Sequence, residues 1–215
     1  MTKLVIIGAG GHGKEVADIL LAQHKESTTT VVAGFIDEDP AKYGAYINGL
    51  QVLGNTNWLF TQPIHAYKVV VAIGNLQVLK KVVTEIKQHG IALTTAISPD
   101  ALVSPSAQVG DGSILFPHTS IGANVQIGEC VTLNVGTSVS HDSIIGKYTG
   151  LNPGVRCAGS VQIGEGAYIG IGTSIIQGRK IGSWSTIGAG AVVIRDIPDH
   201  VTAVGIPAKV IKSNK

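Results

Sequence analysis

The most regular feature of the chain is an apolar residue at every sixth position. The series runs from Ile97 to Val193 without a slip, and its 17 members are aliphatic except Cys157. A period of six matches neither the 3.6-residue repeat of an α-helix nor the two-residue repeat of a strand. An antiparallel sandwich would not hold one phase over so long a stretch. The spacing is typical of hexapeptide repeats, so we expect a parallel β-helix over 96–194 with these residues pointing inward.

The first 95 residues follow a different pattern, in which continuous apolar runs alternate with helical spacing. We predict strands in "KLVIIGAG", "TVVAGFID" and "KVVVAIGN", and helices in "GKEVADILLAQ" and "LQVLKKVVTEIKQHG", the second ending at Gly90. Strands alternating with helices indicate a small parallel-sheet α/β domain. The expected organisation is a Rossmann-like domain over 1–95, a β-helix over 96–194 and a C-terminal tail over 195–215.

Composition and charge exclude several classes. The 215 residues carry a formal charge of +2, which gives no electrostatic support for a nucleic-acid or membrane partner. No apolar run approaches the roughly 20 residues that span a bilayer, and the start "MTKLVIIGAGG" is not a signal peptide. Two cysteines, Cys130 and Cys157, form no disulfide framework, so we expect a reducing, cytoplasmic setting.

A glycine-rich loop follows the first predicted strand. Gly8, Gly10 and Gly13 have the spacing of the dinucleotide fingerprint, and Asp37 lies at the end of the second predicted strand. An NAD-dependent dehydrogenase is the obvious interpretation, but the α/β region is half the usual pair of mononucleotide units. Glycines before a helix also let backbone N–H groups approach the pyrophosphate of a nucleotide sugar. His12 lies in this loop and either contacts the phosphate or sugar or faces water.

The segment "VSHDSIIG" brings an imidazole and a carboxylate into the repeat. His141 comes two positions after the inward-facing Val139, so its side chain should leave the β-helix near a corner. A histidine can accept a proton at neutral pH, and Asp142 can orient it. His118 is the competing candidate but lacks a flanking acid, and a surface histidine is the alternative for both. A zinc site would need three histidines, so we predict no metal.

The chain resembles the left-handed β-helix acyltransferases in three segments: the hexad run, "VIRDIP" at the end of that run, and the C-terminal "VGIPAKVI". The opening "IIGAGGHGKEVADIL" in front of them resembles the PglD- and NeuD-like sugar acetyltransferases, and the likeness covers essentially the whole chain. It implies three hexads per coil, so that residues 18 apart stack and His141 lies between Ala123 and Gly159. It also implies a homotrimer.

The resemblance implies a function. An acetyl-CoA-dependent N-acetyltransferase would act on the amino group of a nucleotide-linked sugar, such as a UDP-4-amino sugar, in bacterial glycan biosynthesis. An O-acetyltransferase of sialic acid or a related sugar is one alternative. A non-catalytic hexapeptide trimer is another, of a different class.

The same resemblance implies the site residues. The catalytic pair would be His141 and Asp142, where the PglD-like members have a glutamate as the acid. The substrate residues would be Gly10, Gly11, His12, Asp37, Glu38 and Gly74. The residues lining acetyl-CoA would be Gly159, Ile171, Gly188 and Ala189. Some members place a second histidine where this chain has Gly150, which puts a donor contact from that position in doubt.

Overall fold

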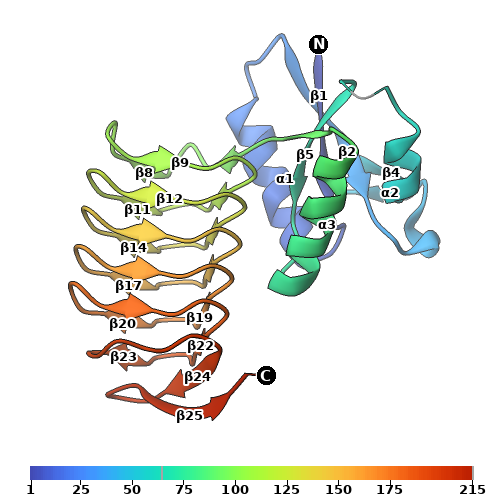
Figure 1. The fold of residues 1–215 in the computed structure, drawn as a ribbon. Coiled ribbons are helices and arrows are strands. Elements are labelled where there is room, and N and C mark those ends of the chain that lie inside the picture. Colours follow the sequence, from blue (N-terminus) through green and yellow to red (C-terminus); the bar gives the residue numbers. More distant parts are fainter. Residues whose placement is uncertain (64, 215) are drawn as a thin grey trace. The chain divides into compact units, whose positions relative to one another are not determined.

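The computed structural model describes residues 1–63 and 65–214, in two compact units (Figure 1). The first spans Met1–Pro99, and the second begins at Asp100. The expected boundary at 95/96 lies four residues earlier. Among the described residues, no helix combines the length and hydropathy that a membrane crossing requires.

The first unit is an α/β domain around a mainly parallel sheet. Its strands are β1 (Thr2–Ile7), β2 (Thr30–Ile36), β3 (Tyr46–Ile47), β4 (Leu50–Gly54), β5 (Tyr67–Val71) and β6 (Ala92–Leu93), in the order β3-β4-β2-β1-β5-β6. Only β3 and β4 pair antiparallel among these neighbours. The helices are α1 (Gly11–Gln23), α2 (Thr56–Phe60) and α3 (Leu76–Gln88), with a 3₁₀ turn at Pro40–Lys42 and a short strand, β7 (Ala96–Ile97). The three predicted strands and both predicted helices are present.

Local chemistry explains where the two long helices lie and end. Helix α1 buries Val16, Ile19 and Leu20, the residues whose spacing predicted it. Helix α3 begins after Asn75, whose side-chain oxygen accepts hydrogen bonds from the next helical N–H groups. Gly90 ends its last turn with a φ of 69°, a conformation that favours glycine.

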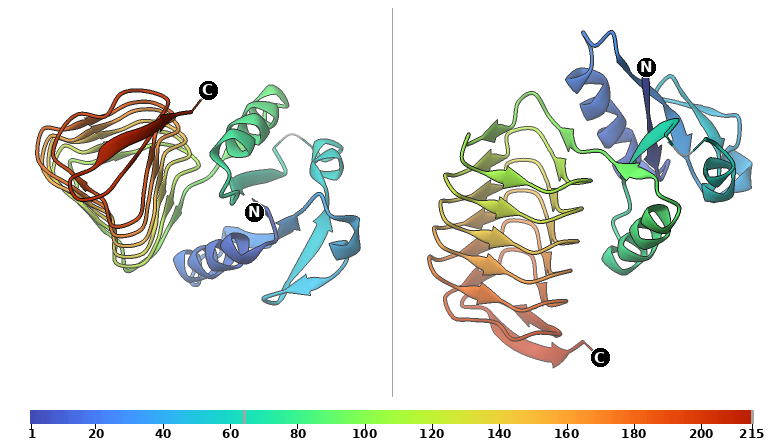
Figure 2. Two further views of the ribbon diagram at one scale, coloured as in Figure 1. Left: turned by 90° about the horizontal axis from the view of Figure 1, so that it is seen from below. Right: turned by 45° about the horizontal axis from the view of Figure 1, so that its top comes forward.

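The second unit is a left-handed parallel β-helix built from strands of two residues. One face holds β8 (Leu102–Val103), β11 (Ser120–Ile121), β14 (Ser138–Val139), β17 (Arg156–Cys157), β20 (Ser174–Ile175) and β23 (Val192–Val193). The next holds β9 (Gln108–Val109), β12 (Gln126–Ile127), β15 (Ile144–Ile145), β18 (Gln162–Ile163) and β21 (Lys180–Ile181). The third holds β10 (Ile114–Leu115), β13 (Thr132–Leu133), β16 (Gly150–Leu151), β19 (Tyr168–Ile169) and β22 (Thr186–Ile187). The view along the axis in Figure 2 shows the triangular cross-section.

The coil length is 18 residues, as the resemblance implied. Ile121 pairs with Val139, and Val139 pairs with Cys157, each one coil further along. The hexad residues are buried from Leu115 onward, whereas Val103 and Val109 in the first coil are half-buried. The sixfold apolar pattern therefore forms the core of the β-helix.

Buried hydroxyl groups tie the corners of neighbouring coils together. Ser143 Oγ donates to the carbonyl of Ala158, and Thr149 Oγ1 donates to the carbonyl of Gly164. Ser113, Thr137 and Thr173 make the same bond, each to a carbonyl 15 residues on. A buried hydroxyl without a partner would be costly, so these bonds both satisfy the side chains and fix the corners.

The predicted tail is not a separate segment. β24 (Val201–Val204) pairs parallel with β22 and continues the third face, and β25 (Lys209–Ser213) pairs antiparallel with β24. Both strands lie within the predicted tail, 195–215, and leave the hexad phase, so they carried no periodic signal. β25 covers the hydrogen-bonding edge that β24 would otherwise expose.

Candidate functional site

His141 and Asp142 share the corner between β14 and β15. Asp142 has a φ of 58°, a left-handed conformation that aspartate tolerates better than most residues. The corner leaves both side chains accessible, with exposed fractions of 64% for His141 and 53% for Asp142. Their Nδ1 and Oδ2 atoms lie 2.8 Å apart. A carboxylate only accepts hydrogen bonds, so the proton of the neutral imidazole lies on Nδ1 and the lone pair on Nε2.

The other oxygen of Asp142 is bonded to a residue that sequence reasoning missed. Asn124, one coil earlier, donates from Nδ2 to Asp142 Oδ1 over 3.1 Å. The hydrogen bond from His141, followed by that from Asn124, holds the pKa of Asp142 below its usual value. The carboxylate is therefore charged at neutral pH. Spacing could have identified Asn124, because it lies 18 positions before Asp142.

Gly159 provides the surface on which the His141 ring lies. A Cβ atom on Gly159 would come within 2.5 Å of His141 Cε1 and 2.6 Å of Nε2. On this side of the corner the imidazole itself occupies the space that a side chain at position 159 would fill. The Gly159 carbonyl accepts a hydrogen bond from Gly178 N, one coil further along.

The remaining residues expected to line acetyl-CoA lie on later coils. Ile171 is 58% exposed, and the exposed Ala189 occupies the equivalent corner position one coil on. Gly188 is packed more closely, because a Cβ there would lie 2.7 Å from Val204 Cγ1. Its lack of a side chain therefore accommodates β24. Lys209 is exposed at the start of β25.

The competing reactive groups of the repeat lie elsewhere. His118 is exposed at a different corner, between β10 and β11, with a φ of 61°. Burial raises the pKa of Cys157 to about 12, so this inward-facing thiol stays protonated. Among residues 1–63 and 65–214, no three His, Cys, Asp or Glu side chains gather in a way that could hold a metal ion.

The glycine loop lies at the carboxyl end of β1, where the strand order reverses between β2 and β5. In parallel sheets such a switch point is the usual ligand site. Gly8 and Gly13 serve packing: a Cβ on Gly8 would lie 2.7 Å from the Ala72 carbonyl oxygen, and one on Gly13 would collide with the Gly8 carbonyl. Gly10, Gly11 and Gly74 have nothing within 4 Å of a Cβ position. The exposed backbone of Gly10 and Gly11 forms the positive N-terminus of α1.

His12 starts the same helix. Burial lowers the pKa of His12, and the nearby carboxylate of Glu15 offsets this only in part. The imidazole is therefore mostly neutral at pH 7. Any contact it makes with a phosphate or sugar would be a hydrogen bond rather than an ion pair.

Asp37 is engaged on both carboxylate oxygens. Oδ2 accepts from Ala9 N at 2.8 Å, Oδ1 accepts from Asp39 N at 3.0 Å, and Lys42 Nζ bonds to both at 3.0 and 3.1 Å. Burial raises the pKa of Asp37, but the N–H bonds from Asp39 and Ala9 and the Lys42 ammonium outweigh it, so the net pKa is lowered. The carboxylate anchors the glycine loop and has little acceptor capacity left for a nucleotide base.

Glu38, the second acidic candidate, accepts hydrogen bonds on only one of its two carboxylate oxygens among the bonds of the described residues. Its Oε1 accepts from the backbone N–H and the hydroxyl of Thr56, at the start of α2. Its Oε2 has no such partner among the hydrogen bonds of the described residues. Of the two acids predicted to bind the substrate, Asp37 and Glu38, Glu38 retains the accessible oxygen.

Comparison with known proteins places this geometry in a family. Residues 3–86 match the model of the PglD N-terminal domain, and residues 160–195 match the bacterial transferase hexapeptide. PerB from Caulobacter crescentus, solved with CoA and GDP-perosamine, is 36% identical, with 98% of this chain and 97% of that chain covered and a TM-score of 0.89. The acetyltransferase domain of PglB from Neisseria gonorrhoeae, solved with acetyl coenzyme A, is 34% identical, with 97% and 98% covered and a TM-score of 0.88.

The chain belongs to the PglD-like family of sugar acetyltransferases. WeeI from Acinetobacter baumannii is similar too, at 31% identity over 98% of this chain and all of that one, with a TM-score of 0.88. Among curated sequences, the matches cover only 23% of the uncharacterized protein L142 of Acanthamoeba polyphaga mimivirus and 13% of a serine acetyltransferase from Bacillus pumilus. In each case the matched segment spans less than a quarter of the curated relative.

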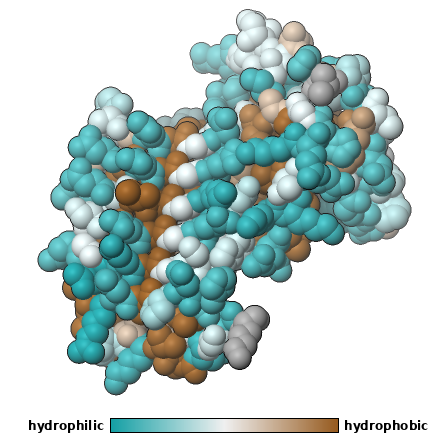
Figure 3. Space-filling view, viewed as in Figure 1, coloured by the Kyte–Doolittle hydropathy of each residue, from teal (hydrophilic) through white to brown (hydrophobic). Residues whose placement is uncertain are grey.

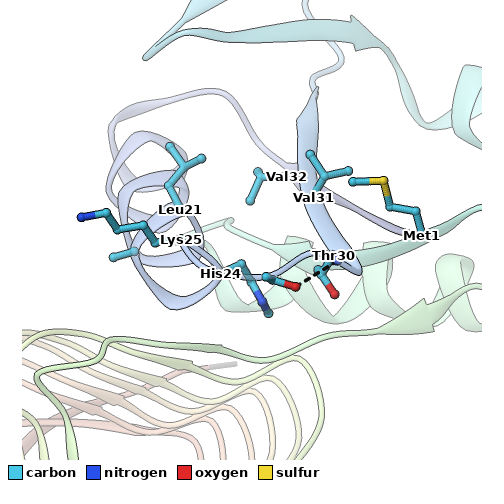
Figure 4. Close-up of a pocket in the computed structure, with 9 residues that line it drawn as sticks. Met1, Leu21, His24, Lys25, Thr30, Val31 and Val32 are labelled. Atoms are coloured by element: carbon cyan, nitrogen blue, oxygen red, sulfur yellow. Dashed lines mark hydrogen bonds between the residues drawn. The ribbon is translucent and has the colours of Figure 1, made fainter.

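A separate hollow of the PglD-like N-terminal unit lies away from the predicted site residues. It measures about 590 Å³, is open to solvent and lies between the end of α1 and β2, with Met1, Leu21, His24 and Val31 among its lining residues (Figure 4). His24 Nε2 is buried there and has no hydrogen-bond partner among the described residues.

Proposed function

We propose that this protein is an acetyl-CoA-dependent N-acetyltransferase of a nucleotide-linked amino sugar. The observation that carries the proposal is the His141–Asp142 pair, exposed at a β-helix corner with Nδ1 2.8 Å from the carboxylate, in a chain that is 36% identical to PerB over 98% of its length. An enzyme of this class needs an accessible base, and Nε2 of His141 supplies one.

The reaction requires one proton to move. The amine nitrogen of the sugar attacks the thioester carbonyl of acetyl-CoA, and His141 Nε2 accepts the proton that the nitrogen loses. The C–S bond then breaks, the amide forms, and the imidazolium returns the proton to the CoA thiolate. Asp142 stabilises the imidazolium, and such a base contributes about 10²- to 10⁴-fold to the rate.

The relatives support a catalytic rather than a binding role for this histidine. Two variants of the C. crescentus enzyme, with one histidine replaced by alanine or by asparagine, were solved with both CoA and GDP-perosamine. Both ligands therefore bind to that protein without its histidine. We expect the same separation of binding from proton transfer at His141.

The N-terminal unit is proposed to hold the diphosphate of the nucleotide sugar. The open backbone at Gly10, Gly11 and Gly74 leaves room for an anion at the start of α1. His12 would add a neutral hydrogen-bonding group, and Glu38 Oε2 an acceptor for the base. Asp37 would act indirectly, by holding Ala9 and thus the loop.

Acetyl-CoA is proposed to lie along the corners that carry Gly159, Ile171, Gly188 and Ala189, in a groove completed by a second subunit of a homotrimer. Exposed apolar side chains such as Leu102, Ile144 and Ile171 favour such an assembly, and Figure 3 shows an apolar stripe along the stack of coils. Residues 97–194 carry only nine Asp, Glu, Lys or Arg. The two buried free cysteines fit a reducing cytoplasm, and the proposed substrate class fits bacterial glycan biosynthesis.

The deciding experiment is mass spectrometry of the products formed from acetyl-CoA and a panel of UDP-, GDP- and dTDP-linked amino sugars. We expect one nucleotide sugar to gain an acetyl group on nitrogen. Acetylation of a hydroxyl, or of sialic acid alone, would replace the proposal by an O-acetyltransferase. A protein that binds no CoA and forms no product would be a non-catalytic hexapeptide trimer.

A further inference from the structure

A chain of side-chain contacts crosses three successive coils and ends at the catalytic histidine. The backbone N–H of Asn124 donates to Ser106 Oγ at 3.0 Å, its Nδ2 donates to Asp142 Oδ1 at 3.1 Å, and Asp142 Oδ2 accepts from His141 at 2.8 Å. Ser106, Asn124 and Asp142 lie 18 residues apart and so occupy equivalent corners. The carboxylate of Asp142 is thus held from two sides.

We propose that Asn124 is a positioning residue: its amide fixes the Asp142 carboxylate in the orientation that bonds to His141 Nδ1, and so keeps the imidazole lone pair on Nε2. The inference rests on the proposed function of the His141–Asp142 pair. Asp142 is 53% exposed, so without Asn124 nothing described in the structure holds its second oxygen against rotation toward water.

An amide is suited to this position for two reasons. Its N–H donates to the carboxylate without adding a charge, so among the described residues only His141, once it has taken up a proton, is a cationic hydrogen-bond partner of Asp142. Asn124 also has a φ of 58°, which asparagine adopts more readily than most residues. An aspartate would fit the backbone equally well but would set two acceptors against each other.

The first test is a double-mutant cycle with glycine, which removes each side chain and suits the positive φ. We expect Asn124→Gly to lower kcat about three- to tenfold while the KM of both substrates changes less than about twofold, because orientation and not binding is lost. In the Asp142→Gly background the same substitution should cost nothing further. An equal loss in both backgrounds, no loss at all, or a loss confined to KM would overturn the proposal.

A matched control is available in the first unit. Asn48 has a φ of 47°, and its Nδ2 donates to Asp18 Oδ1 at 3.3 Å, but no histidine follows in the chain of contacts. Asn48→Gly should leave kcat unchanged. If it lowered kcat as much as Asn124→Gly, the effect would be a general one of losing an Asn–Asp bond.

The second test needs no turnover, so it separates this inference from the proposed function. ¹⁵N NMR of the imidazoles, with His141 assigned by comparison with His141→Ala, reports which ring nitrogen carries the proton. We expect His141 in the wild type to be protonated on Nδ1 when neutral, and Asn124→Gly to increase the Nε2–H form. An unchanged tautomer in Asn124→Gly would overturn the proposal even if the protein acetylates no sugar.

Discussion

The imidazole of His141 lies on the backbone of Gly159, so close that a methyl group at position 159 would meet Cε1 at 2.5 Å. One coil of the β-helix thus carries the proposed base, and the next supplies the surface on which its ring lies. The glycine is required by its neighbour's ring, since its own φ lies outside the left-handed region.

Gly159→Ala should therefore displace the imidazole. We expect kcat to fall about tenfold or more, because even a shift of about 1 Å in a reacting group is costly. In a His141→Ala background the added methyl group meets no ring and should cause no further loss. Steady-state kinetics of the two single variants and the double variant measure this, and a fully active Gly159→Ala would show that the ring can relocate freely.

His141→Ala should abolish proton transfer while sparing binding. We expect kcat to fall about 10²- to 10⁴-fold with little change in either KM. Asp142→Asn should cost less, because the imidazole remains and loses only its anionic partner. His118→Ala is the comparison: if it abolished activity while His141→Ala kept more than about a third of the wild-type kcat, the base would be His118.

Asp37 should make the first unit sensitive to acid. Its folded-state pKa lies below the ordinary 3.8, so its stabilisation is fully present above pH 3.8 and is lost as pH falls through the lower folded value. Asp37→Asn should cost about 1–3 kcal/mol at pH 7, since it breaks charge-assisted bonds to a side chain that is only 13% exposed. Thermal melts from pH 7 downward should show a constant difference that narrows below about pH 4. If the stability difference between the wild type and Asp37→Asn persisted below about pH 4, the lost stability would come from the altered shape of the side chain and not from its charge.

The glycine loop should bind a nucleoside diphosphate and not NAD. The acid that would hold the ribose of NAD, Asp37, already bonds Ala9, Asp39 and Lys42. Calorimetry should give heat with either UDP or GDP and none with NAD. Tight NAD binding would contradict the assignment of this domain to a nucleotide sugar.

The sequence predicted the β-helix because an apolar residue recurs at every sixth position from Ile97 to Val193. It also predicted the pairing of His141 with Asp142, which are neighbours in the chain. The contribution of Asn124 was missed because a contact across coils has no local signal until the 18-residue period is applied to polar positions. The engagement of Asp37 could not be foreseen either, since it depends on the 3₁₀ turn Pro40–Lys42, which brings the Lys42 ammonium back to the Asp37 carboxylate.

Asn124, His141 and Gly159 occupy three adjacent coils, and strands on adjacent coils lie about 4.8 Å apart. A histidine–acid pair moved by 18 residues would keep its corner geometry and shift by one such step along the axis. A site built on this fold can therefore move along the β-helix axis only in steps of about 4.8 Å. Acceptors of different length could be matched by choosing the coil that carries the base, with no change to any loop.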